Sequence, residues 1–250
     1  MATDTSTSLR FAVLLTVASG FLDAYTFISR GGVFANAQTG NVILMGINFS
    51  AGNVRAALEH VWPISAFVVG VAIANSLKSP HAKRVVKHPI RAAMVAQVVV
   101  LVSVGFVPTT VPDALVTIPI AFVAALQIGL FRTVRSLSYI AIATTGNLMR
   151  LTETAYAGFL GKDPEARKNT GVYAVIVGGF AAGAVIGAVC TRIFGHEAAW
   201  LAASLLFCAL VLFFIDEQED GRDSARRRRV AGWLNRSQAV KPRIRARRRP

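Results

Sequence analysis

Charged residues are scarce in this sequence. They make up 16% of the 250 residues, whereas apolar residues make up 54%. A soluble domain of this length has no core large enough to hide so many apolar side chains. The composition therefore excludes an ordinary soluble globular protein and favours lipid as the surrounding solvent.

Cysteine and catalytic motifs are also nearly missing. The two cysteines, Cys190 and Cys208, lie inside apolar runs and are too few for a disulfide framework. The four histidines fall at predicted helix ends or in loops and show no metal-ligand spacing. The sequence has no nucleophile elbow, phosphate-binding loop or pair of catalytic carboxylates. We therefore expect no enzyme activity, no cofactor and no bound metal.

Long apolar runs are what the sequence has instead. A helix that spans a bilayer needs about 20 mostly apolar residues. We predict an all-α integral membrane protein with about six transmembrane helices. The six runs are Leu9 to Ile28, Val61 to Leu77, Ile90 to Val107, Ala114 to Phe131, Thr170 to Ile193 and Ala198 to Ile215.

The net charge of +14 is concentrated at the C-terminal end. From Arg222 to Pro250 the chain is rich in arginine, and Asp223 is the only acid. We predict that residues 217–250 form a disordered cytoplasmic tail that lies against anionic lipid head groups. Nucleic acid is the less favoured partner, because a run of charge carries no element that reads bases.

A short polar phrase, TGN, occurs twice. The first copy, AQTGNVILMG, has TGN at residues 39–41, and the second, ATTGNLMRLT, has it at 145–147. Each copy follows an apolar run that ends near arginine, and each is followed by two further apolar runs. We expect each TGN segment to be a broken or re-entrant helix packed inside the protein. After a polar leader, 1–8, the transmembrane domain over 9–216 then divides into two repeats, 9–107 and 114–216.

The positions of lysine and arginine test this topology. If the six long runs span and both TGN segments re-enter, the inside holds Arg10, the cationic loop 78–91, the region 132–168 and the basic tail. The outside keeps only three arginines, at positions 30, 55 and 192. Both termini are then cytoplasmic. Because each repeat has three spans, an odd number, the second repeat must be inverted relative to the first, as in many transporters.

The TGN phrase suits the start of a helix inside a membrane. Such a start leaves backbone N–H groups unpaired and carries partial positive charge. We expect Thr39 and Thr145 to act as N-caps, the glycines to allow close approach of a backbone or ligand, and the asparagines to offer both donors and acceptors. Two such starts meeting from opposite sides would form a polar midplane site. A purely structural role, in which TGN locks the broken helix, is an equal alternative.

Asp23 is the most informative single residue, because an ionisable group inside a spanning helix is costly and is usually functional. It could carry a coupling proton or cation. The alternative is a structural hydrogen bond, or a salt bridge with Arg132 or Arg30. Gln127 lies at a similar distance ahead of the second TGN. The predicted substrate-binding residues are Asp23, Asn36, Gln38, Thr39, Gly40, Asn41, Gln127, Thr144, Thr145, Gly146 and Asn147.

These features favour a transporter for an unidentified small solute, with its site between the two TGN helix starts. Two alternatives stay open. A passive, channel-like facilitator would also suit paired re-entrant helices. A non-transporting membrane scaffold would use the basic tail as its interaction element.

The segments GFLDAYTFISRGGVFANAQTGNVILMG, ALQIGLFRTV and TTGNLMRL together resemble the YoaK-like family of uncharacterised bacterial polytopic membrane proteins. The resemblance covers about residues 10–215 and leaves out the arginine-rich tail. It implies a multi-pass protein of the bacterial inner membrane, and it implies no substrate.

Overall fold

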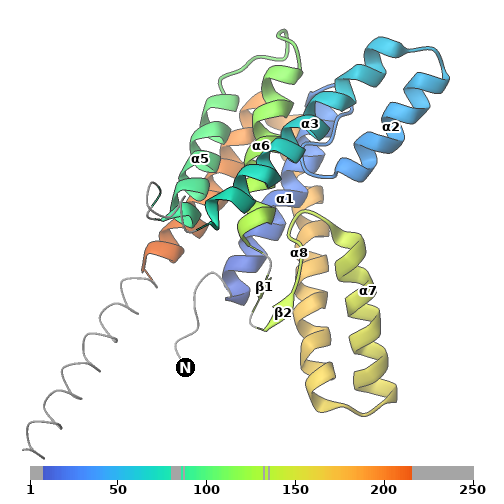
Figure 1. Cartoon of the computed structure of the whole chain (residues 1–250), viewed down its shortest axis with the longest axis vertical. Coiled ribbons are helices and arrows are strands. Elements are labelled where there is room, and N and C mark those ends of the chain that lie inside the picture. Colours follow the sequence, from blue (N-terminus) through green and yellow to red (C-terminus); the bar gives the residue numbers. More distant parts are fainter. Residues whose placement is uncertain (1–7, 80–85, 87, 132, 135, 216–250) are drawn as a thin grey trace, which may run out of the picture.

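The computed structural model describes residues 8–79, 86, 88–131, 133–134 and 136–215 (Figure 1). The predicted leader (apart from Ser8), half of the cationic loop 78–91, Arg132 and the basic tail fall outside these residues. The elements in chain order are α1 (Leu9–Ser29), α2 (Gln38–Ser50), α3 (Val54–Leu77), α5 (Pro89–Val104), α6 (Ala114–Leu130), β1 (Thr133–Val134), β2 (Leu137–Ser138), α7 (Thr144–Ala155), the π-helical turn η2 (Tyr156–Leu160), α8 (Pro164–Phe194), the 3-10 turn η3 (Gly195–Ala198) and a final helical segment, 199–215.

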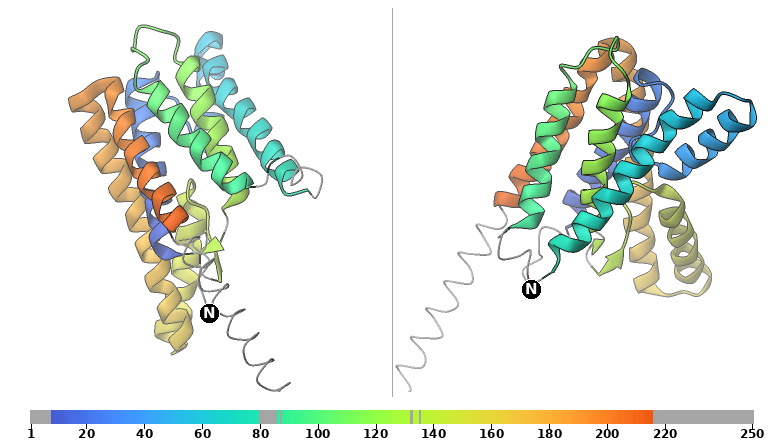
Figure 2. Two further views of the ribbon diagram at one scale, coloured as in Figure 1. Left: turned by 90° about the vertical axis from the view of Figure 1, so that its left-hand side faces the viewer. Right: turned by 45° about the horizontal axis from the view of Figure 1, so that its top comes forward.

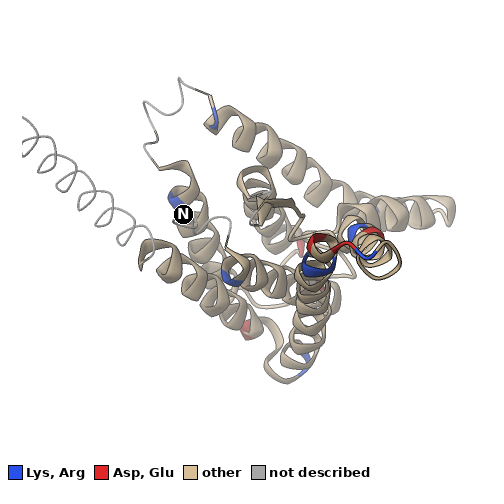
Figure 3. Cartoon of the chain, turned by 90° about the horizontal axis from the view of Figure 1, so that it is seen from below, with Lys and Arg blue, Asp and Glu red and all other residues tan. Residues whose placement is uncertain are grey.

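The fold is mostly helical, and several helices have the length and composition of membrane spans. Three stretches are long and apolar enough to cross a bilayer, namely Leu9–Ser29, Val54–Leu77 and Pro164–Ile215, and two shorter apolar helices are Pro89–Val104 and Ala114–Leu130. The ribbon is almost free of charged residues except near helix ends and at the turn before α8 (Figure 3). These features indicate a multi-pass membrane protein, as the composition predicts.

Small residues allow two pairs of helices to pack closely. In the contact between α1 and α8, a Cβ atom added at Gly20 would collide with the carbonyl oxygen of Phe180, and one at Gly183 with that of Val17. In the contact between α3 and α6, a Cβ at Gly70 would lie 2.6 Å from the Cβ of Ala125. Small residues therefore line the faces on which these helices pack.

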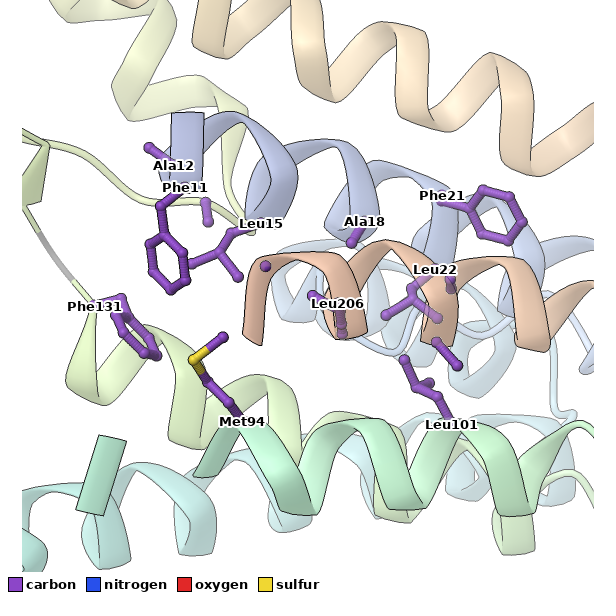
Figure 4. Packing of buried hydrophobic residues seen from close by; sticks show 14 of the residues in the cluster. Phe11, Ala12, Leu15, Ala18, Phe21, Leu22, Met94, Leu101, Phe131 and Leu206 are labelled. Carbon is purple, nitrogen blue, oxygen red and sulfur yellow. The ribbon is translucent and has the colours of Figure 1, made fainter. Parts of the chain in front are cut away.

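One hydrophobic core joins the halves of the chain. Phe11, Leu15 and Leu22 of α1 pack in it with Met94 of α5 and Leu206 of the final segment (Figure 4). The same cluster includes Ala35, Tyr139 and Ala141, which belong to the non-helical segments before α2 and α7. We call these two non-helical segments, one before α2 and one before α7, the breaks. Both therefore border a common core.

The course of the chain is similar in the two halves but runs in opposite directions. In Figure 1, α1 rises, the segment 30–37 returns to the middle of the molecule, and α2 rises again before α3 descends. Next, α6 descends, the segment with β1 and β2 returns to the middle, and α7 descends again before α8 rises. Both views of Figure 2 show the chain reversing at η3 into the segment 199–215.

The expectation that the TGN helices are packed inside the protein is wrong for both. In α7 only Asn147 is buried, and Leu148 and Met149 are exposed. The helix α2 is equally exposed. Asn41 is the buried residue of α2. Val42, Ile47 and Phe49 are exposed, because α2 contacts α3 on one side and presents its other faces outward. An apolar exposed face of this kind suits lipid. The short antiparallel pair of β1 and β2 was not predicted either, since two-residue strands leave no recognisable pattern in a sequence.

Candidate functional site

The segment before α2 is held against α1 by side chains of α1. The Thr26 hydroxyl oxygen accepts a hydrogen bond from the backbone N–H of Ala35 at 3.1 Å. Asp23 Oδ1 accepts from the N–H groups of Asn36, at 2.9 Å, and Ala37, at 3.2 Å. Asn36 Nδ2 in turn donates to the carbonyl of Ser19 at 3.0 Å. The carboxylate of Asp23 thus pairs backbone donors at the break, which satisfies groups that water would otherwise have to reach.

Asn41 closes the turn at the start of α2. Its Oδ1 accepts from the backbone N–H of Phe34 at 2.9 Å, and its Nδ2 donates to the carbonyl of the same residue at 2.6 Å. Nδ2 also donates to Gln38 Oε1 at 2.9 Å. The ring of Phe34 covers Gly40, where a Cβ would lie 2.6 Å from a ring carbon. Glycine is therefore needed here for internal packing. The pair of hydrogen bonds from Asn41 to the backbone of Phe34 holds the break in place, and we call this arrangement the asparagine lock.

Asn147 forms the same lock at the start of α7. Its Oδ1 accepts from the N–H of Ile140 at 3.2 Å, and its Nδ2 donates to the carbonyl of Ile140 at 2.7 Å and of Ala143 at 3.2 Å. In both copies the partner lies seven residues before the asparagine. The two glycines differ, however. A Cβ at Gly40 would collide with Phe34, whereas a Cβ at Gly146 would meet nothing within 4 Å.

The threonines do not have the predicted capping role. The N-caps are Ala37 and Ala143, neither with a side-chain capping bond, so each helix begins one residue before its TGN threonine. Thr39 and Thr145 are exposed. The capping prediction is wrong because Asp23 and the two asparagines pair the backbone near each break from other positions, and an N-cap hydroxyl is not required there.

Several polar atoms around the two breaks are buried without a partner. Among the described residues, six buried side-chain N or O atoms have no hydrogen bond, and five of them belong to residues near the breaks. On the first half these are Asp23 Oδ2 and Asn36 Oδ1, and on the second half they are Gln127 Nε2, the Tyr139 hydroxyl and the Thr144 hydroxyl. Asp23 is 5% exposed, and Asn36 and Gln127 are each 2% exposed. Unpaired buried polar atoms are rare, so these atoms are candidate contacts for a ligand, ion or water.

Gln127 of α6 lies eighteen residues before Thr145, a similar distance to the sixteen between Asp23 and Thr39, but it bonds differently. Its Oε1 accepts from Gln97 Nε2 of α5 at 2.6 Å. Both amides are buried, so this is a buried hydrogen bond between α5 and α6. Gln127 keeps its own Nε2 unpaired at the end of α6, just before the second break.

Arg30 is not a hydrogen-bonding partner of Asp23 in this structure. Its guanidinium is fully buried and donates from Nη1 to the carbonyl of Pro108, at 3.0 Å, and from Nη2 to that of Val107, at 2.5 Å. The other partner considered, Arg132, lies outside the described residues. Arg30 thus ties the end of α1 to the turn after α5.

His60 was not identified from the sequence as a site residue. The sequence places it just before the predicted span that begins at Val61, whereas α3 begins at Val54 and carries His60 inside the fold at 4% exposure. Its Nδ1 lies 3.4 Å from Asn41 Oδ1 and its Nε2 lies 3.3 Å from Asn48 Nδ2. The spacing of His60 to Asn41 in the sequence gives no sign of this contact, which depends on the hairpin of α2 and α3. Within the described part of the chain, no group of three or more His, Cys, Asp or Glu side chains is placed to hold a metal ion.

Comparison with known proteins identifies the family of this chain. The model of one protein family, described as a protein of unknown function (DUF1275), matches residues 11–212. The chain belongs to the DUF1275 family. The DUF1275 match includes both TGN locks and Asp23, and it ends before the basic tail. No curated protein and no solved structure matches the chain. The YoaK-like name suggested by the sequence segments stays a prediction.

Proposed function

We propose that this protein is a small-solute transporter of the bacterial inner membrane. Six helices span the bilayer as two inverted repeats, and each repeat carries one re-entrant TGN helix. The solute site lies near the midplane between the two helix starts, and Asp23 is its titratable member, able to carry a coupling proton or cation.

Three relationships support an inverted repeat. The packing is reciprocal, since α1 of the first half contacts α8 of the second and α6 of the second contacts α3 of the first. The asparagine lock has the same partners at the same spacing in both halves. The two TGN helices also run in opposite directions from the middle of the molecule (Figure 1). Repeats inserted with opposite topology, with broken helices at the midplane, are the plan of many secondary transporters.

The observation that carries the transport proposal is the set of unpaired buried polar atoms at the two breaks. Unpaired acceptors occur on the first half, at Asp23 and Asn36, and an unpaired amide donor occurs on the second half, at Gln127. Leaving such groups unpaired costs roughly 1–3 kcal/mol each. A site that binds a polar solute reversibly needs groups of this kind, because the solute supplies the missing hydrogen bonds.

The orientation follows from the positions of lysine and arginine. The start of α1, the end of α3, the start of α5 and the end of the segment 199–215 lie together at the lower left of Figure 1. With the cation-rich side in the cytoplasm, the first TGN helix enters from outside and the second from inside. The basic tail then lies against anionic lipid head groups on the cytoplasmic face.

A metabolite screen by thermal shift on the purified full-length protein tests the proposal. We expect a small polar solute to raise the melting temperature of the wild type and to have no such effect on Asp23→Asn. Glu153→Gln, an exposed acid on α7, is the matched control and should respond as the wild type does. If a solute stabilises Asp23→Asn as much as the wild type, Asp23 is not part of the site.

A passive facilitator is the second candidate. The two TGN helices run in opposite directions from the middle of the molecule, as paired half-helices that line a pore would (Figure 1). Uptake of the identified solute into proteoliposomes separates the two. A coupled carrier concentrates the solute when a proton or cation gradient is imposed and loses this in Asp23→Asn. A facilitator only equilibrates it, with or without the gradient.

A further inference from the structure

A polar cavity of about 440 Å³ lies where α1 ends and the hairpin of α2 and α3 turns. This volume is in the range of small-molecule sites. The cavity lies beyond the C-terminal end of α1, whereas the start of α1 is cytoplasmic in the proposed orientation. The cavity therefore lies on the outer side of the membrane. Its lining consists of Gly31, Asn48, Asn53, Arg55, Ala56, Glu59 and His60.

The buried wall of this cavity is connected to the first TGN lock through His60. Asn48 Nδ2 donates to the carbonyl of Leu44 at 3.0 Å, which identifies that atom as the amide nitrogen. His60 Nε2 faces the same nitrogen at 3.3 Å and must therefore be an acceptor. The hydrogen of the neutral ring is then on Nδ1, which faces Asn41 Oδ1 at 3.4 Å. His60 thus links the cavity directly to the asparagine that closes the break.

Two carboxylates from different elements converge beside Gly31. A Cβ atom built on this glycine would lie 2.8 Å from Asp113 Oδ2 and 3.8 Å from Glu59 Oε2. Gly31 also has a φ of +66°, so glycine is favoured here both by its backbone conformation and by the approach of Asp113. Burial raises the pKa of Asp113, the Arg30 charge opposes this, and the Glu59 charge raises it further. A positive group between the two carboxylates would remove their repulsion.

A positive charge that lines the same cavity has no acidic partner on its own helix. Arg55 precedes Glu59 by one turn of α3, yet within the described residues no ion pair joins them. With the basic residue first, such a helical pair is the weaker of the two orientations. The Arg55 guanidinium is therefore available to pair with the carboxylate of a ligand, which it can bind through a bidentate hydrogen bond.

We propose that this cavity is the outer binding site for the transported solute, which is a small zwitterion. Its ammonium group pairs with Glu59, on the side of the cavity where Gly31 separates it from Asp113, and its carboxylate pairs with Arg55. His60 is a positioning residue that joins the occupied cavity to Asn41. This inference rests on the proposed transport function and names the class of solute.

Binding measurements with chemically blocked ligands test the proposal. The probes are free amino acids, their carboxamides and their N-acetyl derivatives, added to the purified full-length protein in lipid vesicles. We expect at least one free amino acid to bind, and blocking either end to weaken binding about tenfold to a hundredfold, because each end loses a charged hydrogen bond. Arg55→Gln should no longer distinguish the amino acid from its carboxamide. Glu59→Gln should discriminate less against the N-acetyl form.

Arg192→Gln and Glu153→Gln remove exposed charges elsewhere and should keep the wild-type preferences. The proposal is overturned if no free amino acid binds, or if Arg55→Gln and Glu59→Gln keep the wild-type discrimination between blocked and free ligands. It is also overturned if some other solute binds and loses its affinity in Asp23→Asn while the Arg55 and Glu59 variants bind it normally. In that last case the transport function stands and only the outer zwitterion site is wrong.

Discussion

Asn41 and Asn147 make the same two hydrogen bonds, each to the backbone N–H and the carbonyl of the residue seven positions earlier. The asparagines lie 106 positions apart in the sequence and begin helices that run in opposite directions (Figure 1). A carboxamide is the one neutral side chain type that offers a donor and an acceptor side by side, so it can satisfy both the N–H and the C=O of one residue. This explains why the repeated phrase ends in asparagine.

Replacing either asparagine should loosen its break. Asn41→Ala and Asn147→Ala each leave partly buried backbone groups of Phe34 or Ile140 without partners, so we expect each to lower the free energy of unfolding by about 1–2 kcal/mol. Denaturant unfolding of the purified protein measures this. Asn53→Ala changes an exposed asparagine that makes no capping bond and serves as the control. Equal stability of all three variants would contradict the role of the locks.

The glycines of α8 should differ sharply in their tolerance of a methyl group. Gly183 packs against the backbone carbonyl of Val17, so Gly183→Ala must push α1 and α8 apart and should cost at least about 1–3 kcal/mol. Gly178 has nothing within 4 Å of its Cβ position. Gly178→Ala should therefore be neutral or stabilising by up to about 1 kcal/mol, since alanine favours the helix. Thermal unfolding of the two variants side by side checks this; a loss of similar size at both would show that α1 and α8 do not pack as described.

Asp113 should make stability fall as the pH rises. Burial and the nearby Glu59 raise its folded-state pKa above the ordinary value of 3.8, despite the opposing charge of Arg30. Between the unfolded and folded pKa values the folded protein binds more protons, so stability decreases as pH increases through that window. Asp113→Asn removes this penalty. We expect the variant to melt at a higher temperature than the wild type at neutral pH, with the gain shrinking toward acid. A gain that is the same at every pH would have a different cause.

Asp23→Asn should separate folding from function. The side chain keeps its shape and retains an oxygen that can accept from the N–H groups of Asn36 and Ala37, so the break should still form. The unfolding free energy is then expected to change by no more than about 1 kcal/mol, while coupled uptake is lost. Circular dichroism melting and uptake by the same preparation give both readouts. Collapse of the fold in this variant would assign Asp23 a purely structural role.

Much of the helical framework could be predicted from the sequence. The six apolar runs coincide closely with α1, α3, α5, α6, α8 and the segment 199–215, because long runs of apolar residues have few other solutions in a membrane. The largest boundary error concerns α3, which begins seven residues before Val61. Polar residues in its first turns face α2 and the outer cavity, so hydropathy does not detect them.

The candidate site was predicted only in part. Asp23, Asn36 and the TGN residues could be named because polar residues in apolar surroundings stand out. Their partners could not, since the bonds from Asp23 to the 36–37 backbone and from His60 to Asn41 depend on how the chain folds back. Arg30 shows the same limit. Its charge suggests an ion pair, but its position at the end of α1 directs it to the carbonyls of Val107 and Pro108.

The most direct test of the account is sided labelling of the two TGN helices. Thr39 and Thr145 are exposed at the start of α2 and α7, so single cysteines can be placed there after Cys190 and Cys208 are changed to serine. With a membrane-impermeant thiol reagent, the account predicts that Thr39→Cys reacts only from the outside and Thr145→Cys only from the cytoplasmic side. Reaction of both cysteines from one and the same side would contradict the inverted arrangement and the solute site built on it.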